Sequence, residues 1–503
     1  MSVIVMDFGG QYKELIARCA RRLGVFSEIK SGAITANELE TLSPDGVILT
    51  GGPNSVYDEN AKKCDPRIFE LGIPILGICY GMHVMCRALG GEVSAGAGEY
   101  GVTITTFDEK SPLFRGAGEA AETLMSHKDA VTRLPDGFIK TAYTDECDCA
   151  AFENARKKLF GVQFHPETEH TSGGDKIIGA FLDICGAQRD YDVGDYMERQ
   201  IEKARRQAGK SKILLALSGG VDSAVCAALL SEAVPDGLSC VFVDHGFMRL
   251  NEGDEIEEAF SDRNLNFIRV NAQKRFLDKI EGVTDPESKR KIVGAEFARV
   301  FEEEAAKLSD VRFLAQGTIY PDIIESGAGE AATIKSHHNV GGLPKNLNFD
   351  GVIEPLSGLF KDEVRVIGEK LGLPKSLTER PPFPGPGLCI RIMGAVTEEK
   401  LKILRLADYI FRDEIEKSDV KPEQYFAVFT GAHSVGVKGD KRAYDNVIAL
   451  RAVNTVDFMT CSYTKIPHEL LGKIASRVAN EVPSVSRVVY DITSKPPATV
   501  EWE

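Results

Sequence analysis

One stretch of the chain, from Lys212 to Ala224, constrains the possible folds more than any other. It begins with a run of apolar residues of strand length, continues into a turn rich in Ser and Gly, and ends in small residues with helical spacing. A strand, a glycine turn and a helix in this order gather several backbone N–H groups and the positive end of a helix dipole around one point. The stretch therefore predicts an anion site at the end of a strand in an α/β fold.

The turn has the sequence Ser-Gly-Gly-Val-Asp-Ser, and its residue types suit phosphate. Gly219 and Gly220 allow the main chain to approach an anion closely, while Ser218 and Ser223 supply hydroxyl donors. Asp222 would repel a phosphate unless a divalent cation lay between them, so we predict Mg²⁺ at Asp222. The turn is not a P-loop, because the pattern G-x-x-x-x-G-K-[ST] is absent. An ordinary glycine-rich turn of a parallel sheet is the alternative interpretation.

The turn resembles the pyrophosphate loop of the N-type ATP pyrophosphatases, which cleave ATP to AMP and pyrophosphate while activating an oxygen for amination or thiolation. The resemblance implies that the turn binds ATP and its pyrophosphate through these residues: Ser218, Gly219, Gly220, Val221, Asp222, Ser223 and Ala224. Lys361 opens an amphipathic helix, where a lysine usually belongs to a solvated face. We nevertheless predict that Lys361 neutralises the leaving pyrophosphate, since the glycine turn supplies no cation.

Length and charge narrow the class of protein. A chain of 503 residues is too long for one core, so about two to four domains are expected. The formal charge of −15 disfavours a large nucleic-acid interface, since a phosphate backbone needs a basic face. No apolar stretch reaches the ~20 residues of a membrane span, and the first residues lack the pattern of a leader peptide. We therefore expect neither a nucleic-acid partner nor a membrane partner.

The eleven cysteines, an odd number scattered over a large chain, are typical of cytosolic thiols rather than of a disulfide framework. Cys147 and Cys149 have the wrong spacing for a zinc pair and lack a second pair. They are expected to be buried thiols on a strand. The chain is thus predicted to be a cytoplasmic enzyme that uses a metal.

Residues 1–189 alternate apolar runs of strand length with helical patterns, which favours an α/β layer with a mostly parallel sheet. Cys79 lies in the sequence Gly-Ile-Cys-Tyr-Gly, between a strand expected at residues 73–78 and a helix. This is the spacing of a nucleophile elbow with Cys in place of Ser. The flanking glycines permit the sharp turn, and the helix N-terminus stabilises a thiolate.

Such a nucleophile needs a base, a group that orients the base, and donors for an oxyanion. His165 follows a strand expected at residues 159–164, and Glu167 is placed to fix the tautomer of its ring. Gly52, after a strand expected at residues 46–50, and Tyr80 offer amides for an oxyanion hole. Singly, Cys79 is best explained as an inert buried thiol and His165 as a surface histidine. Their joint occurrence favours catalysis.

This segment resembles the class I glutamine amidotransferases over nearly its full length, on the motifs DFGGQY, LTGGP, GICYGM, SHKD and FHPE. The resemblance implies a flavodoxin-like glutaminase in which a thioester forms on Cys79 and ammonia is released, with His165 and Glu167 completing a triad. Three residues depart from the usual family pattern: His83, Lys128 and Gly98.

Residues 190–380 resume the alternation of strands and helices around the glycine turn. A second apolar run ends in Val243-Asp244-His245-Gly246. Ligands of open parallel sheets bind beyond the carboxyl ends of strands, so Val243, Asp244 and Gly246 are predicted to border the adenosine. A solvated strand end is the alternative. Residues 336–344 have the composition of a mobile lid, and a metal at their paired histidines is rejected because no third ligand is nearby.

Residues 381–503 open with Arg-Pro-Pro-Phe-Pro-Gly-Pro-Gly, a rigid hinge, and continue as mixed helices and strands. With the glutaminase motifs, the sequences SGGVDS, KSHHNVGGL, RPPFPGPGL and KPPATVEWE appear in an order that resembles the glutamine-hydrolysing GMP synthase family. The resemblance implies that ATP adenylylates xanthosine monophosphate (XMP) and that ammonia then displaces AMP to form GMP. It further implies that Arg290, Lys495 and Glu501 contact XMP, that the last domain forms a homodimer, and that no organic cofactor is needed.

The predicted organisation has three domains: a class I glutamine amidotransferase domain at 1–189, an ATP pyrophosphatase domain of adenine-nucleotide α-hydrolase-like fold at 190–380, and a smaller α+β dimerisation and acceptor-binding domain at 381–503. Two enzymes are alternatives, another pyrophosphate-releasing amidoligase and a thiolase acting on transfer RNA. The thiolase would need a reactive cysteine pair and a basic surface. A binding protein with a dead active site is the alternative from another class, and the intact Cys79, His165, Glu167 and Asp222 argue against it.

Overall fold

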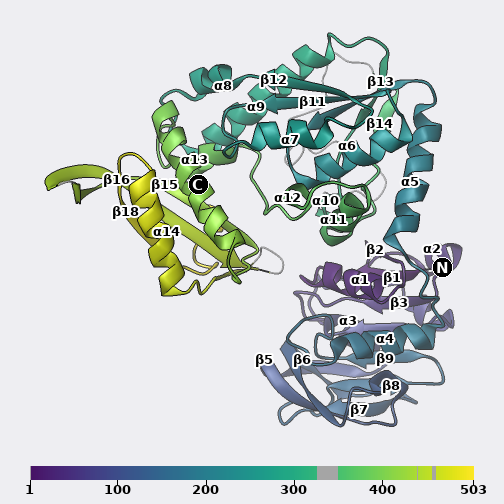
Figure 1. The fold of residues 1–503 in the computed structure, drawn as a ribbon. Coiled ribbons are helices and arrows are strands. Elements are labelled where there is room, and N and C mark those ends of the chain that lie inside the picture. Colours follow the sequence, from purple (N-terminus) through teal and green to yellow (C-terminus); the bar gives the residue numbers. More distant parts are fainter. Residues whose placement is uncertain (1, 326–348, 439, 456–459) are drawn as a thin grey trace. The chain divides into compact units, whose positions relative to one another are not determined.

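The computed structural model describes residues 2–325, 349–438, 440–455 and 460–503, and it divides the chain into two units (Figure 1). The first unit ends at Asp195 and the second runs from Tyr196 to Glu503. Within the described ranges, none of the helices combines the length and apolar character that crossing a membrane would need. The loop predicted as a lid, residues 336–344, lies outside the described residues.

The first unit contains a nine-stranded sheet in the order β2-β1-β3-β4-β9-β8-β7-β5-β6. Its first five strands are parallel to their neighbours: β2 (Ser27–Ser31), β1 (Val3–Asp7), β3 (Gly46–Leu49), β4 (Ile75–Ile78) and β9 (Leu159–Val162). The remaining four are antiparallel: β8 (Ala151–Asn154), β7 (Ile139–Tyr143), β5 (Glu92–Phe107) and β6 (Ala120–Arg133). The α/β class is confirmed, but a mostly parallel sheet is wrong for this second half. The long strand β5 is mostly exposed and carries three glycines, so it lacks the continuous apolar run of a buried parallel strand.

Four helices accompany this sheet: α1 (Lys13–Arg22), α2 (Ala36–Leu42), α3 (Tyr80–Ala88) and α4 (Gly174–Cys185). Residues of α2 and α3, such as Leu39 and Met82, share one hydrophobic cluster with Met6 of β1 and Leu49 of β3. Helices α1 and α4 contact each other outside that cluster. Because β3, β4 and β9 are parallel neighbours, the segments that follow their carboxyl ends meet at one edge of the sheet.

Helix α5 (Val193–Ala208) spans the boundary between the units, and the second unit contains a five-stranded parallel sheet in the order β12-β11-β10-β13-β14. The strands are β10 (Lys212–Leu217), β11 (Leu238–Asp244), β12 (Asn266–Asn271), β13 (Val311–Ala315) and β14 (Gly351–Ile353). The chain proceeds from β10 to one side and then returns to its other side with β13. In open parallel sheets such a reversal of strand order marks the crevice where ligands bind. The glycine turn at residues 218–220 follows β10 and therefore borders that crevice.

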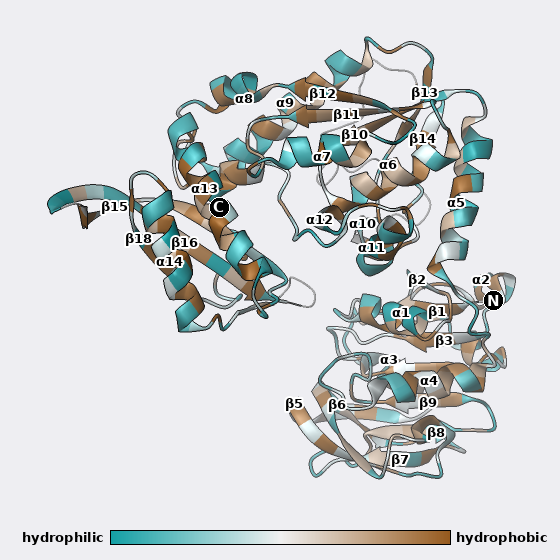
Figure 2. Ribbon diagram, viewed as in Figure 1, coloured by the Kyte–Doolittle hydropathy of each residue, from teal (hydrophilic) through white to brown (hydrophobic). Residues whose placement is uncertain are grey.

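The helices around this sheet are α6 (Val221–Ala233), α7 (Glu252–Phe260), α8 (Gln273–Ile280), α9 (Pro286–Ala305), α10 (Tyr320–Glu325), α11 (Lys361–Lys370) and α12 (Lys375–Thr378). In Figure 2 strands β10 and β11 are hydrophobic along their length, whereas α5 alternates hydrophilic and hydrophobic residues as an amphipathic helix does. Every residue of β11 is buried. This agrees with the continuous apolar run that the sequence shows there.

The last part of the chain adds a four-stranded sheet and two long helices. The strands are β15 (Gln424–Lys438), β16 (Lys441–Asn454), β17 (Ser462–Tyr463) and β18 (Val485–Asp491), and the helices are α13 (Glu398–Glu416) and α14 (His468–Glu481). One hydrophobic core joins this part to the parallel sheet, because Phe247 and Phe276 belong to the same cluster as Leu404 and Phe411. The division at residue 381 into a third domain stays a prediction.

Candidate functional site

Cys79 occupies a strained turn between β4 and α3. Its φ of +50° lies in the left-handed region, which a residue with a side chain adopts only when its surroundings enforce it. The amide of Cys79 donates to the carbonyl of Val162 at 2.7 Å, which ties the turn to β9. A Cβ added to Gly81 would lie 2.4 Å from the carbonyl oxygen of Leu49, so the turn tolerates no side chain there. The structure thus builds the nucleophile elbow that the spacing predicts.

His165 and Glu167 lie beside this elbow. The Nδ1 atom of His165 is 2.8 Å from Oε1 of Glu167. Burial is the largest influence on the His165 pKa and lowers it, but the charge of Glu167 and the hydrogen bonds with Cys79 and Glu167 together outweigh it. The net result raises the pKa of His165 from 6.5 to about 10. An imidazole with this pKa readily takes the proton of a thiol and stabilises the thiolate.

Exchanging Glu167 for glutamine is expected to lower the rate of glutamine hydrolysis by about 10²- to 10⁴-fold, because the ring loses the charge that stabilises its protonated form. The pKa of His165, followed by NMR, should fall from about 10. A proton that binds more tightly in the folded state stabilises the fold below the unfolded pKa of 6.5, and this contribution disappears as the pH approaches 10. The stability difference between the two proteins should therefore be largest below pH 6.5.

Glu169 provides a matched control, since it is an exposed glutamate two residues further along. Glu169→Gln should leave both the hydrolysis rate and the His165 titration unchanged. An unchanged titration in Glu167→Gln would contradict the assigned pair.

The turn after β3 brings two glycines next to the nucleophile. A Cβ on Gly51 would lie 3.2 Å from Cε1 of His165 and 3.9 Å from Cβ of Cys79. A Cβ on Gly52 would lie 3.0 Å from the ring of Tyr80. A side chain at either position would crowd its neighbours, which would have to shift by a few tenths of an ångström. The predicted oxyanion residues Gly52 and Tyr80 are thus adjacent, and their role as donors stays a prediction.

Two buried residues at this site were not predicted from the sequence as functional. Gln163 Nε2 lies 3.8 Å from the sulfur of Cys79, and its Oε1 lies 2.7 Å from Nε2 of His83. Burial lowers the pKa of His83 to about 4, so this ring is neutral and holds Gln163 in place. His83, which differs from the usual residue of the family, is therefore held in the structure by Gln163. Gln163 directly follows β9 and stands two residues before His165. Its nearness to the predicted base was the only sequence feature that could have marked it as functional.

The glycine turn of the second unit lies between β10 and α6. Gly219 has a φ of +82°, and the hydroxyls of Ser218 and Ser223 lie 3.0 Å apart. The amide of Gly220 donates to Ser218 Oγ at 3.3 Å, and Ser223 Oγ donates to the carbonyl of Gly220 at 3.0 Å. The structure brings the predicted residues of this turn together, with Val221 and Ala224 in the first turn of α6.

Asp222 and Lys361 meet at this turn although 139 residues separate them in the sequence. Lys361 Nζ donates to Oδ2 of Asp222 at 2.5 Å, and α11 begins at Lys361 as predicted. The other oxygen of Asp222, Oδ1, is buried and has no hydrogen-bond partner among the described residues. A carboxylate oxygen left in this way suits a hard cation, which prefers oxygen ligands. After the end of β13, Gly317 approaches the start of α6, where a Cβ would lie 3.0 Å from the backbone carbon of Asp222.

The predicted adenosine residues lie at the carboxyl end of β11, beside the glycine turn. Val243 is buried, and Asp244 Oδ2 pairs with Arg269 at 3.1 Å. Oδ1 of Asp244 accepts from the amide of Gly246 at 3.1 Å, and Gly246 has a φ of +81°. Asp244 thus shapes the strand end, and contact with adenosine stays a prediction.

The predicted acceptor residues lie at the junction of α9 with the last residues of the chain. Arg290 donates to the backbone carbonyl of Glu503 at 2.5 Å, and Glu501 pairs with Arg391 at 2.8 Å. Gln424 also donates to Glu501 at 3.0 Å. Lys495 bridges to Cys461 through its backbone, so its placement in the site stays a prediction. Arg391 and Gln424 were missed: each lies far from Glu501 in the sequence, and neither stands in a motif that predicts such contact.

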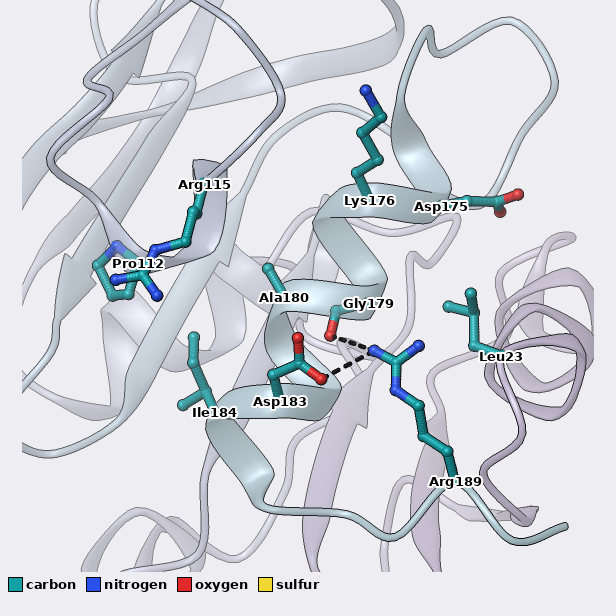
Figure 3. Close-up of a pocket in the computed structure, with 10 residues that line it drawn as sticks. All are labelled: Leu23, Pro112, Arg115, Asp175, Lys176, Gly179, Ala180, Asp183, Ile184 and Arg189. Atoms are coloured by element: carbon teal, nitrogen blue, oxygen red, sulfur yellow. Dashed lines mark hydrogen bonds and ion pairs between the residues drawn. The ribbon is translucent and has the colours of Figure 1, made fainter.

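A cavity of about 480 Å³ lies elsewhere on the first unit, along α4 (Figure 3). Arg189 spans its floor, with hydrogen bonds to the carbonyl of Gly179 at 3.2 Å and to Asp183 at 2.8 Å. Its lining does not include Cys79, His165 or Glu167. The cavity is therefore separate from the predicted nucleophile, base and orienting carboxylate.

The elbow, the buried histidine–glutamate pair and the surrounding sheet define the first unit as a class I glutamine amidotransferase, and residues 4–185 match the family model described as glutamine amidotransferase class-I. Residues 413–502 match the GMP synthase C terminal domain. The chain belongs to the glutamine-hydrolysing GMP synthase family, as the resemblance predicts.

Relatives that match over the full length of the chain support this family membership. A glutamine-hydrolyzing GMP synthase of Acetivibrio thermocellus is 54% identical over 506 residues, which cover 100% of this chain and 99% of the relative. One from Treponema denticola is 55% identical over 505 residues, covering 100% and 97%. A solved glutamine amidotransferase from Thermotoga maritima is 18% identical, with a TM-score of 0.28, and covers 40% of this chain and 85% of that chain.

Proposed function

We propose that this chain makes GMP from XMP, with ATP as the activating substrate and glutamine as the source of ammonia. The full-length identity to GMP synthases of known name carries the proposal. The chain is accordingly a carbon–nitrogen ligase of guanine nucleotide biosynthesis. Its two reactions use separate sets of residues, one in each unit.

In the first unit, the thiolate of Cys79 attacks the side-chain amide carbon of glutamine and His165 delivers a proton to the leaving ammonia. Glu167 holds the ring with its Nδ1 proton toward the carboxylate, which leaves Nε2 for the thiol. The amides of Gly52 and Tyr80 are proposed to stabilise the oxyanion that forms on the attacked carbon. Water then hydrolyses the thioester and returns glutamate.

In the second unit, the turn at residues 218–224 is proposed to hold the pyrophosphate of ATP while the O2 atom of XMP attacks the α-phosphate. Asp222 is proposed to bind Mg²⁺ through Oδ1, the buried oxygen that has no partner among the described residues. When bound, Mg²⁺ supplies positive charge to the phosphates. Lys361 is proposed to neutralise the leaving pyrophosphate, which requires it to exchange Asp222 for a phosphate oxygen. Val243, Asp244 and Gly246 border the adenosine.

For the acceptor, Arg290, Lys495 and Glu501 are proposed to bind XMP. The hydrogen bond from Arg290 to the backbone of Glu503 supports this, because it brings Arg290 close to the C-terminal segment that carries Glu501. Ammonia then attacks C2 of the adenylylated purine, and AMP leaves. We further propose a homodimer formed by the last part of the chain and a cytoplasmic location.

The expected result of a substrate screen is that XMP alone among purine monophosphates triggers AMP formation. The protein would be incubated with ATP, Mg²⁺, ammonium and one purine monophosphate at a time: XMP, IMP or GMP. The AMP formed from ATP would then be quantified. XMP should raise AMP formation by at least about 10²-fold over background, since adenylylation requires a bound acceptor oxygen. AMP formation with another acceptor, and none with XMP, would point to a different amidoligase.

A further inference from the structure

A second cluster of polar side chains lies in the first unit, on the antiparallel half of its sheet. Glu99 comes from β5, His127 from β6, and Cys147 from the loop between β7 and β8. One ligand atom of each, a carboxylate oxygen, a ring nitrogen and the thiol sulfur, lie within 4.8 Å of one another. His127 is 6% exposed and Cys147 is 2% exposed. Two buried groups beside a partly buried carboxylate, all of different chemistry, require an explanation.

The hydrogen bonds of His127 fix the direction of its ring. Nδ1 lies 2.8 Å from the backbone carbonyl of Asp129, and a carbonyl oxygen only accepts, so Nδ1 carries a proton. In the neutral ring Nε2 then presents a lone pair. This atom lies 3.2 Å from Oε2 of Glu99, which is also an acceptor. A second proton on the ring, a proton on the Glu99 carboxyl or a cation must therefore lie between them.

The other groups are held with equal care. The second oxygen of Glu99 accepts from Thr144 Oγ1 at 2.8 Å, and the same hydroxyl accepts from the amide of Cys147 at 2.9 Å. The register of β5 and β6 shifts between Ala95 and Glu99, which places Glu99 directly opposite His127. Irregularities of this kind redirect side chains near functional sites. Hydrogen bonds that orient the ligands in this way are the usual outer shell of a protein metal site.

We propose that Glu99, His127 and Cys147 bind a divalent cation of the zinc type. Carboxylate, imidazole and thiolate are the ligands that Zn²⁺ uses, and tetrahedral sites separate their ligand atoms by roughly 3.3–3.7 Å. The ligand atoms lie within 4.8 Å of one another, so the side chains must adjust to reach this geometry, and three protein ligands leave a fourth position open. Burial, with a smaller effect of the Glu99 charge, raises the pKa of Cys147 to about 11, so a bound cation displaces the thiol proton.

Cys149 does not take part in this site. Its sulfur donates to the carbonyl of Ala151 at 3.7 Å, and both cysteines lie in the loop before β8 rather than on a strand as expected. The rejected zinc pair of Cys147 and Cys149 is thus a different arrangement from the proposed site. The site adjoins the nucleophile along β6, because the carbonyl of Ser126 accepts from Cys79 Sγ at 3.8 Å. A cation on His127 restrains the strand beside Cys79.

The test uses the full chain with Cys79→Ala, so that the elbow itself cannot hold a metal through its thiol. Zinc binding would be measured by equilibrium dialysis against a competing chelator, and Co²⁺ would report a sulfur ligand through its thiolate charge-transfer absorption. One Zn²⁺ per chain is expected. Adding Cys147→Ser should remove both the zinc and the absorption, whereas adding Cys149→Ser, the matched control, should preserve them. Glu99→Gln should weaken binding by about 10-fold or more.

A thermal unfolding series guards against a folding defect. The parent protein is the full chain with Cys79→Ala. In chelator, the proteins that also carry Cys147→Ser or Glu99→Gln should unfold within a few degrees of the parent. Added Zn²⁺ should raise the Tm of the parent and of the Cys149→Ser protein only. If Cys147→Ser lowers the Tm in chelator, the zinc binding of the Glu99→Gln protein is used to test the proposal instead. Absence of zinc binding in the parent, or binding that survives both Cys147→Ser and Glu99→Gln, would overturn the proposal in favour of a protonated His127 paired with Glu99.

Discussion

Replacing Cys79 with alanine is expected to abolish glutamine-dependent GMP synthesis while synthesis from added ammonium continues. We propose the thiol as the nucleophile of the first unit, and loss of a covalent nucleophile costs about 10³- to 10⁶-fold in rate. The side chain is small, and the strained turn is held by the bond between the Cys79 amide and the Val162 carbonyl, which alanine keeps. The measurement is GMP formation with each nitrogen source at saturating XMP and ATP.

The ammonium assay is the internal control of this experiment, because it reports the second unit in the same preparation. If synthesis from ammonium is lost as well, Cys79 has a structural role beyond the elbow. If glutamine still supports synthesis at the parental rate, the assignment of the nucleophile is wrong.

Replacing Asp222 with asparagine is expected to reduce pyrophosphate release by about 10²- to 10³-fold with glutamine and with ammonium alike. Asparagine keeps the shape of the side chain but removes the charge that we propose holds Mg²⁺ at Oδ1 and that pairs with Lys361 at 2.5 Å. Since adenylylation precedes amination, the nitrogen source should not matter. Pyrophosphate release and its dependence on Mg²⁺ concentration would be measured together.

Asp278 supplies the comparison variant. It pairs with Lys274 on the exposed surface of α8, and exposed pairs of this kind contribute little. Asp278→Asn should release pyrophosphate at the parental rate. Parental release by Asp222→Asn at low Mg²⁺ would refute the metal assignment.

Local sequence patterns predicted the elements that carry the chemistry. The apolar runs ending at Ile78 and Leu217 became β4 and β10, and Cys79 and Ser218 follow them directly. Both sites depend on one strand, one tight turn and one helix, whose residue types are set by backbone geometry within a dozen positions. The pair of His165 and Glu167 was predictable for the same reason, since the two residues are two positions apart in the sequence.

Contacts between distant segments were harder to predict. Lys361 was assigned to the pyrophosphate by the need for a cation, and the structure pairs it with Asp222 across 139 residues. Arg391 and Gln424, which hold Glu501, carry no local signal because their positions depend on how β15 and the turn before α13 pack. The antiparallel strands β5 and β6 were missed because about half of their residues face solvent and three glycines interrupt the pattern of β5.

The hydrophobic core that joins Phe247 and Phe276 to Leu404 and Phe411 limits how the gene can be dissected. A truncation after residue 380 would leave the first pair of rings without their covering helix, and an isolated fragment of that length should aggregate. The boundary between the two units at Asp195 lies in the first turn of α5, so a cut just before this helix would separate the two units. Split expression and engineered fusions are therefore expected to succeed near that position. The 308 residues of the second unit, Tyr196–Glu503, must stay on one polypeptide.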